Sequence, residues 1–145
     1  MNLLEVAIGI AYAAHKGQKD KYGQPYITHP LRVMMRVNTE EEKIAAVLHD
    51  VVEDTDITLD SLRQAGIPEN IIAAVDCLTK REGEGYEDYL QRAKGNPIAL
   101  KVKIADLEDN MDIRRIDKIT GKDIERLNKY RKAWEELTNI EFRNI

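Results

Sequence analysis

The sequence predicts an all-α protein built as one domain. Helix-breaking residues are scarce, with 8 Gly and 4 Pro in 145 residues, and Val, Ile and Thr fall mostly in three-and-four spacings instead of strand-like alternation. Hydrophobic residues make up 43% of the chain and charged residues 33%, enough apolar mass for a core beneath a solvated surface. Because we find no internal repeat, low-complexity tract or linker, we expect a single domain over residues 1–145.

Helix starts and stops divide the chain. Gly17 is expected to end the first helix, Thr39 and Glu42 form a capping box, and Asn96 precedes a nearly all-apolar helix that Pro97 begins. That last pattern is typical of a central, buried helix. We expect seven to nine helices, over residues 2–16, 30–37, 39–54, 58–66, 68–81, 86–94, from 97 past 107, and 124–137. Residues 118–123 are expected to form a turn, and the amphipathic last helix to pack on the domain or on a second subunit, so an oligomer is compatible with the sequence.

Composition narrows the functional classes. A net charge of −4 and a pI near 5.5 provide no basic footprint for nucleic acid. Cys77 is the one cysteine, so an intrachain disulfide is excluded. The first residues do not resemble a signal peptide, and no apolar run approaches the roughly 20 residues of a membrane span. We therefore expect a cytoplasmic protein without a membrane or nucleic-acid partner.

One stretch concentrates polar groups inside an apolar run. His49, Asp50, Glu53 and Asp54 occur within six positions, and in a continuous helix Glu53 would lie one turn beyond His49 and Asp54 one turn beyond Asp50. His49 and Asp50 would point roughly 100° apart, close to the angle between adjacent ligands of an octahedral ion. Burying such groups is costly unless something binds them, so we expect a metal. The alternative is a solvated, acidic helix end.

A second polar pair favours the metal. Asp106 lies in the middle of the expected central helix, where an ionised and unpaired carboxylate would be expensive, and Asn110 follows one turn later. Imidazole together with carboxylate suits a divalent ion such as Mn²⁺, Fe²⁺, Zn²⁺ or Mg²⁺, and fits none of them uniquely. For His15, by contrast, a role as an ordinary hydrogen-bonded histidine of the core is as good an explanation as a role as a ligand.

Five short motifs, in order, resemble those of a known family. His29, His49-Asp50 and Asp106 match the H…HD…D pattern of HD-domain metal-dependent phosphohydrolases. The surrounding sequence is similar to the hydrolase domain of the RelA/SpoT family, above all to its small stand-alone hydrolases. The likeness covers residues from about 5 to 116. The motifs are His15-Lys-Gly-Gln, Gly23-Gln-Pro-Tyr-Ile-Thr-His-Pro, Leu48-His-Asp-Val-Val-Glu-Asp-Thr, Leu78-Thr-Lys, and Lys103-Ile-Ala-Asp with Asn110-Met.

The resemblance implies a fold, a cofactor and a reaction. It implies an HD-type helical bundle with a central site for a divalent metal, most often Mn²⁺, and removal of the 3′-pyrophosphate from the alarmone (p)ppGpp. The metal would be held by His29, His49, Asp50 and Asp106. Glu53 and Asp54 would orient or deprotonate water, and Asn110 would contact the substrate. The family's synthetase is a separate domain, for which 145 residues leave no room.

The residues that could contact the substrate match the family less closely than the metal ligands do. Lys21, Lys80, Lys19 and Arg81 lie in expected loops where they could face phosphates, although each has an ordinary surface role as its alternative. Tyr86 and Tyr89 could flank a substrate or pack their own helix. Two positions depart from the family: Asp20 replaces an Arg that packs on guanine, and Asp112-Ile113 replaces an Arg-Thr pair. An acid cannot replace a stacked guanidinium.

These departures keep alternatives open. Asp20 is expected either to contact guanine in another way or to indicate a different nucleotide, such as a dinucleotide cofactor or a nucleoside triphosphate. A third alternative is a module that keeps its metal for stability or for sensing a nucleotide without turning it over. Retention of Glu53 and Asp54 argues against this third alternative, because a fold without chemistry has no need of them.

Overall fold

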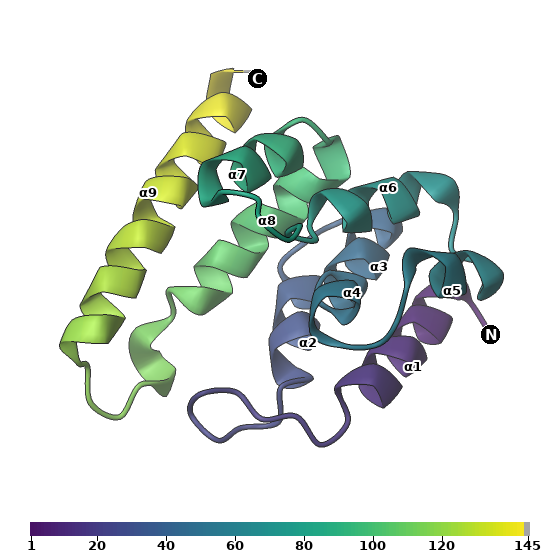
Figure 1. The fold of residues 1–145 in the computed structure, drawn as a ribbon, viewed down its shortest axis with the longest axis horizontal. Coiled ribbons are helices and arrows are strands. Elements are labelled where there is room, and N and C mark those ends of the chain that lie inside the picture. The colour runs from purple at the N-terminus through teal and green to yellow at the C-terminus, as the bar shows by residue number, and fades with distance from the viewer. Residues whose placement is uncertain (144–145) are drawn as a thin grey trace.

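The computed structural model describes residues 1–143, and their side chains as far as residue 139. Throughout this part of the chain every regular element is a helix, which confirms the expected all-α class. The elements are α1 (Leu3–His15), α2 (Thr28–Met35), α3 (Glu40–Leu48), α4 (Val51–Asp54), α5 (Leu59–Gln64), α6 (Glu69–Cys77), α7 (Tyr86–Lys94), α8 (Pro97–Asn110), the 3₁₀ turn η1 (Ile113–Arg115) and α9 (Gly121–Arg143) (Figure 1).

Local sequence explains most helix starts. Thr39 accepts a hydrogen bond from the Glu42 backbone N–H at 3.0 Å, and the Glu42 carboxylate accepts from the Thr39 backbone N–H at 3.1 Å. Asn96 accepts from the first free N–H groups of α8, with Pro97 at the first helical position. Gly17, with φ of 84°, turns the chain away after α1. These contacts are the expected caps.

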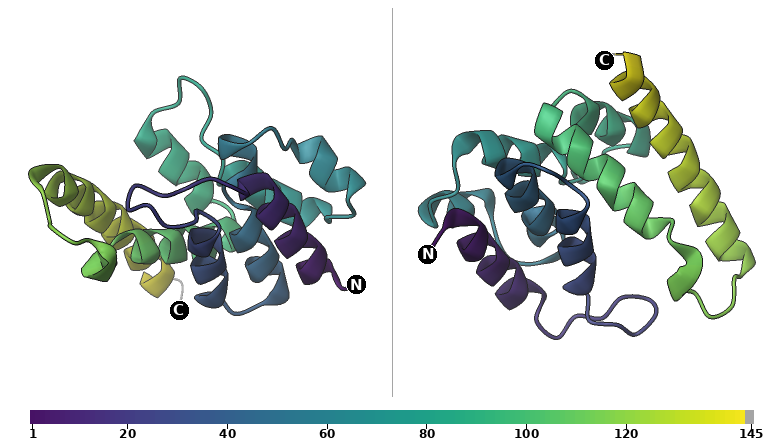
Figure 2. Two further views of the ribbon diagram at one scale, coloured as in Figure 1. Left: turned by 90° about the horizontal axis from the view of Figure 1, so that it is seen from below. Right: turned by 180° about the vertical axis from the view of Figure 1, so that it is seen from behind.

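Helix α8 is the centre of the packing. It contacts α2, α3 and α6 on one side and α7 and α9 on the other. In Figures 1 and 2, α9 runs alongside α8 at one end of the molecule, while α1 and α5 lie at the opposite end. Leu107 of α8 and Leu137 of α9 are both fully buried in the same apolar cluster, so the last helix packs on its own chain. Buried Val102 and Ala105 of α8 belong to the larger cluster built on α3 and α6.

Several expected boundaries were wrong; the helix expected over 68–81, for example, ends at Cys77. The helix expected over 39–54 ends at Leu48 and restarts as α4 at Val51. Helix α2 ends at Met35 instead of residue 37, and residues 113–115, for which no helix was expected, form η1. Helix α9 starts at Gly121, inside the expected turn, because Asp123 accepts hydrogen bonds from the backbone and side chain of Thr120. No helix in the described region is both long and apolar enough to cross a membrane.

Candidate active site

The interruption between α3 and α4 orients the first pair of polar side chains. In a continuous helix the Ala46 carbonyl would accept from the backbone N–H of Asp50. Here it accepts from His49 Nδ1 at 2.5 Å, and the chain leaves the helix at Asp50 (φ −104°, ψ −5°). His49 Nε2 and Asp50 Oδ2 consequently lie 3.1 Å apart instead of pointing along divergent helix faces. The hydrogen bond from His49 to the Ala46 carbonyl therefore links the helix break to the orientation of the imidazole.

His29 reaches the same place from α2. Its Nδ1 donates to Asp109 Oδ2 at 2.7 Å, and its Nε2 lies 2.8 Å from Asp106 Oδ1. Both aspartates belong to α8, so the central helix supplies one carboxylate on each side of the ring. Asp106 Oδ1 also lies 3.2 Å from His49 Nε2 and accepts from Asn110 Nδ2 at 3.3 Å. Asp106 thus connects α2, α3 and α8.

The four groups suit a divalent metal. Ligand atoms of His29, His49 and Asp50 lie within 4.8 Å of one another, and Asp106 contacts both histidines. Each histidine gives its Nδ1–H to an acceptor, which leaves Nε2 as the ring atom directed at the carboxylates. That is the arrangement of metal-binding histidines, whose second nitrogen is held by a carboxylate or backbone carbonyl. The donor set therefore fits the ion that the sequence predicts.

The electrostatics of the cluster are strongly perturbed. Burial would lower the pKa of His49, but Asp50 and Asp106 raise it well above its ordinary value. Burial would raise the pKa of Asp50, yet the neighbouring His49 lowers it to about 2. Lys103 and the two histidines likewise hold the pKa of buried Asp106 well below its ordinary value. Asp50 and Asp106 thus stay charged while nearly enclosed, which requires strong hydrogen-bond donors or a cation beside them.

Two further carboxylates border the cluster. Glu53 Oε1 accepts from the Lys80 backbone N–H at 2.7 Å, so the loop after α6 holds the Glu53 side chain. Burial raises the pKa of Asp54 to about 6, and the charges of Asp50 and Glu53 add to the effect. A carboxylate with a pKa near neutrality can take and release a proton at physiological pH.

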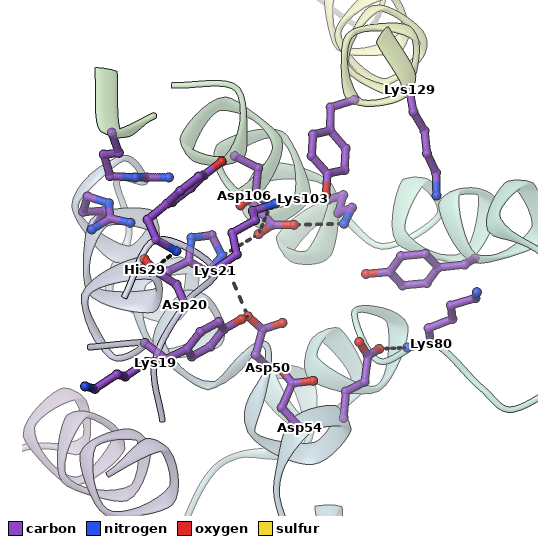
Figure 3. A pocket seen from close by; sticks show the side chains of 18 of the residues that line it. Lys19, Asp20, Lys21, His29, Asp50, Asp54, Lys80, Lys103, Asp106 and Lys129 are labelled. Carbon is purple, nitrogen blue, oxygen red and sulfur yellow. Dashed lines mark hydrogen bonds and ion pairs between the residues drawn. The ribbon is translucent and has the colours of Figure 1, made fainter. Parts of the chain in front are cut away.

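A pocket of about 510 Å³ opens over these groups (Figure 3). Lys19, Asp20 and Lys21 lie on one side of it, beside His29, while Lys80 and Lys129 lie on the other. Nearly all the predicted site residues line this pocket. Those that line it are Lys19, Asp20, Lys21, His29, Asp50, Glu53, Asp54, Lys80, Tyr86, Asp106 and Asn110, with Tyr89 in addition.

Other candidates have local roles. The Asp20 carboxylate accepts from the backbone N–H groups of Tyr22 and Gln24, both at 2.9 Å, and so holds its own turn. Arg81 pairs with Asp76 at 3.4 Å and does not line the pocket. Ile113 is 47% exposed outside the pocket. His15, buried to 1% exposure, donates a hydrogen bond from Nδ1 to Gln18 Oε1 at 2.9 Å.

Several residues in or beside the pocket had not been predicted from the sequence. Asp109 is completely buried and binds His29, but its sequence context resembles that of Asp106 too closely to separate the two roles. Lys103 Nζ donates to Asp106 Oδ2 at 2.9 Å, and its position one turn before Asp106 was the available signal. Tyr26 donates to Asp50 Oδ2 at 2.5 Å from within the Gly-Gln-Pro-Tyr motif. Lys129 and Tyr130 come from α9, beyond the region of family resemblance.

Comparison with known proteins found relatives by sequence and by structure, but no family model matches the chain. Guanosine-3′,5′-bis(diphosphate) 3′-pyrophosphohydrolase of Aquifex aeolicus is 31% identical over 74% of this chain and 17% of its own length. The Synechocystis protein named probable guanosine-3′,5′-bis(diphosphate) 3′-pyrophosphohydrolase is 34% identical over 96% of this chain and 22% of its own length. A Mycobacterium leprae relative, at 32% over 79% of this chain and 16% of its own length, is named a probable GTP pyrophosphokinase.

The matched region is thus a small part of each of these relatives. A solved structure described as a metazoan ortholog of SpoT that hydrolyzes ppGpp has a TM-score of 0.74 and 22% identity, over 92% of this chain and 84% of that one. At this identity the match establishes the fold. Taken with the sequence matches and the motifs that carry them, it places the protein: the chain belongs to the RelA/SpoT family, in the part that resembles the family's hydrolase region.

Proposed function

We propose that this protein is a Mn²⁺-dependent phosphohydrolase that removes the 3′-pyrophosphate from guanosine 3′,5′-bis(diphosphate). The observation that carries the proposal is the pair of histidines with anchored Nδ1 atoms, whose Nε2 atoms meet two carboxylates below a cation-lined pocket. The names of the relatives supply the substrate, and they refer to proteins several times longer than the matched region.

His29, His49, Asp50 and Asp106 would hold the metal. When bound there, a divalent ion supplies a Lewis acid that withdraws charge from a phosphoryl oxygen and makes water more acidic. The second contacts of the ligands keep them in place for this role. Tyr26 holds Asp50, Asp109 holds His29, and the Ala46 carbonyl holds His49.

Glu53 and Asp54 handle the attacking water. Asp54, with its pKa of about 6, is deprotonated near neutral pH and can accept the proton that water loses, while Glu53 is fixed by the Lys80 N–H. The water oxygen bonds to the phosphorus next to the sugar, and the bond to the 3′ oxygen breaks with its electron pair staying on that oxygen. A solvent proton then completes the sugar hydroxyl, and pyrophosphate is released.

The test is pyrophosphate release from guanosine 3′,5′-bis(diphosphate), with and without Mn²⁺, alongside metal analysis. We expect turnover only with the metal, and loss of at least about 1000-fold in kcat for His49→Ala and Asp106→Ala, since either change removes a ligand. No turnover by the metal-loaded protein would remove the alarmone as substrate. Unchanged turnover in either variant would remove the metal mechanism.

One observation favours a second substrate. Asp20 is committed to its own turn and carries no guanidinium plane for a guanine base. A dinucleotide cofactor or a nucleoside triphosphate therefore belongs in the same screen, and preferential turnover of either would replace the alarmone. Tight nucleotide binding without any hydrolysis would instead identify a sensing module.

A further inference from the structure

The loop between α6 and α7 provides the backbone N–H that holds Glu53. Glu53 is exposed and belongs to α4, whose single turn of four residues gives little support to a long side chain. Its orientation therefore depends on where the loop places the Lys80 N–H, which donates to Glu53 Oε1 at 2.7 Å. Lys80 lies on the same side of the pocket as Asp54, away from Lys21 (Figure 3). Whatever fixes this loop consequently fixes one of the two acids assigned to the attacking water.

Arg92 of α7 holds the same loop through several groups. Its guanidinium donates to the Thr79 carbonyl at 2.7 Å and to the Asp76 carbonyl at 3.0 Å. Nε and Nη2 of Arg92 also donate to the two carboxylate oxygens of Glu84, both at 2.7 Å. Glu84 in turn accepts from the Arg81 backbone N–H at 3.0 Å. The side chains of Arg92 and Glu84 are only 20% and 13% exposed, so water competes little for these contacts.

One peptide group connects Arg92 to Glu53. The peptide between Thr79 and Lys80 accepts a hydrogen bond from Arg92 through its carbonyl. The same peptide donates to Glu53 through its N–H. In a trans peptide these two groups point in opposite directions, so the guanidinium and the carboxylate hold the peptide plane from both ends. A charged donor on the carbonyl also polarises the peptide and strengthens its N–H as a donor.

Capping of α6 does not account for the contact between Arg92 and Thr79. Helix α6 ends at Cys77, and the last carbonyls of a helix lack partners within it. The Asp76 carbonyl, which is one of these, already accepts from the Thr79 backbone N–H at 3.1 Å. The Thr79 carbonyl lies beyond the end of the helix, so the hydrogen bond from Arg92 at that point orients the loop.

We infer that Arg92 is a positioning residue for Glu53 and acts on it through the peptide between Thr79 and Lys80. Arg92 and its partner Glu84 do not line the pocket, so their effect on the reaction is indirect. The inference rests on the proposed function, in which Glu53 handles the attacking water, and adds to that function a residue outside the pocket. Without Arg92 the Glu53 carboxylate is still present, but its orientation towards the water is no longer fixed.

A double-mutant cycle tests the assignment. The changes are Arg92→Met and Glu53→Ala, alone and together, and the assay is pyrophosphate release from guanosine 3′,5′-bis(diphosphate). The matched control is Arg81→Met, which removes the same charge from the loop itself. Arg81 is 59% exposed in its side chain, pairs with Asp76 and does not line the pocket.

Arg92→Met is expected to lower kcat about 10-fold, as for a slightly misplaced catalytic group, and to leave KM within about threefold. Arg81→Met should change neither constant by more than about twofold. In the Glu53→Ala background, Arg92→Met should change kcat by less than about twofold, because the group that it positions is gone. An equal loss with and without Glu53, or a loss confined to KM, overturns the assignment. If Arg92→Met does not fold, Arg92→Lys keeps the charge without the planar fork and should produce about a threefold loss with the same dependence on Glu53.

Amide hydrogen exchange keeps this test separate from the proposed reaction. It is measured by NMR on the metal-free protein, because Mn²⁺ broadens nearby resonances. In Arg92→Met the Lys80 N–H should exchange about 10-fold faster than in the wild type, and Arg81→Met should leave its rate within about twofold. The Leu78 N–H donates to the Ala74 carbonyl at the end of α6, and its exchange should stay within about twofold in Arg92→Met.

The two amides decide between positioning of the loop and general support of the helix. Faster exchange at Lys80 without faster exchange at Leu78 supports the positioning role even if no nucleotide is hydrolysed, and in that case only the proposed reaction fails. Unchanged exchange at Lys80, or equal acceleration at both amides, overturns the role of Arg92 even if the nucleotide is hydrolysed.

Discussion

Replacing Asp109 with Asn should separate two roles of one buried carboxylate. The Asp109 side chain is wholly inaccessible and bonds to His29, Arg32 and Arg115. An amide keeps one oxygen that can still accept from His29 Nδ1, but it removes the negative charge that the arginines face. Stability should therefore fall sharply while the imidazole keeps much of its orientation.

The magnitude follows from the burial of the partners. Breaking a fully buried ion pair costs about 3–5 kcal/mol, and exposed pairs cost about 0–1 kcal/mol. Since Arg32 and Arg115 are 33% and 23% exposed, part of the lost interaction is replaced by water, and we expect about 3 kcal/mol. For a chain of this size that loss corresponds to a melting temperature roughly 6–12 °C lower. Affinity for Mn²⁺ should fall about 10-fold in Asp109→Asn and about 100-fold in Asp109→Leu, where no acceptor remains.

Urea unfolding and calorimetric Mn²⁺ titration measure the two effects. Asp112→Asn is the control, because Asp112 pairs with the 85% exposed Arg114 and should cost less than about 1 kcal/mol. The reasoning is refuted if Asp109→Asn unfolds within 1 kcal/mol of the wild type, or if Asp109→Leu binds Mn²⁺ as the wild type does.

Three further predictions concern other parts of the molecule. Hydrogen bonds from Arg92 lower the pKa of Glu84 to about 2. The pairing of Arg92 with Glu84 therefore stabilises the protein above the ordinary carboxyl pKa, and this stabilisation is lost as the pH falls towards 2. In thermal unfolding between about pH 7 and 2.5, the difference in stability between the wild type and Arg92→Met should shrink as the pH falls. Burial raises the pKa of the Cys77 thiol, so it should react with a disulfide reagent more slowly at pH 8 than in the urea-unfolded chain, and equal rates would contradict this. Leu107→Ala, at a fully buried position between α8 and α9, should cost about 2–5 kcal/mol in urea unfolding, and a loss below 1 kcal/mol would show that the two helices are not held there.

The helices were predictable because capping residues close in the sequence determine where they begin. Thr39 with Glu42, and Asn96 with Pro97, are capping patterns whose partners lie within three residues, and both form as expected. The break after Leu48 was not predictable by the same reasoning. Residues 40–54 have helical spacing throughout, and the interruption depends on the His49 side chain taking the Ala46 carbonyl. Side-chain competition for a backbone acceptor leaves no mark in hydrophobic periodicity.

The site divides in a similar way. The predicted candidates are polar groups in apolar surroundings, and the structure gathers nearly all of them around one pocket. Contacts between residues far apart in the sequence could not be predicted. Asp109 accepts a hydrogen bond from His29, 80 positions earlier, and Tyr26 donates one to Asp50, 24 positions later. Such pairings depend on how α2, α3 and α8 pack. A single sequence contains no local pattern that specifies them.

Under the proposed function, we expect substrate choice to follow from the difference between the two walls of the pocket. Asp20, where the family places a stacking Arg, is held by the N–H groups of Tyr22 and Gln24 and therefore serves the turn instead of a base. The adjoining wall provides guanidinium groups fixed by Asp109, which suit phosphate better than a base edge. A pocket that replaces stacking with fixed positive charge gains more from extra phosphates than from a particular purine. We therefore expect selectivity to follow the number and position of phosphate groups, and in a nucleotide screen the loss on removing a 5′ phosphate should exceed the loss on exchanging guanine for adenine.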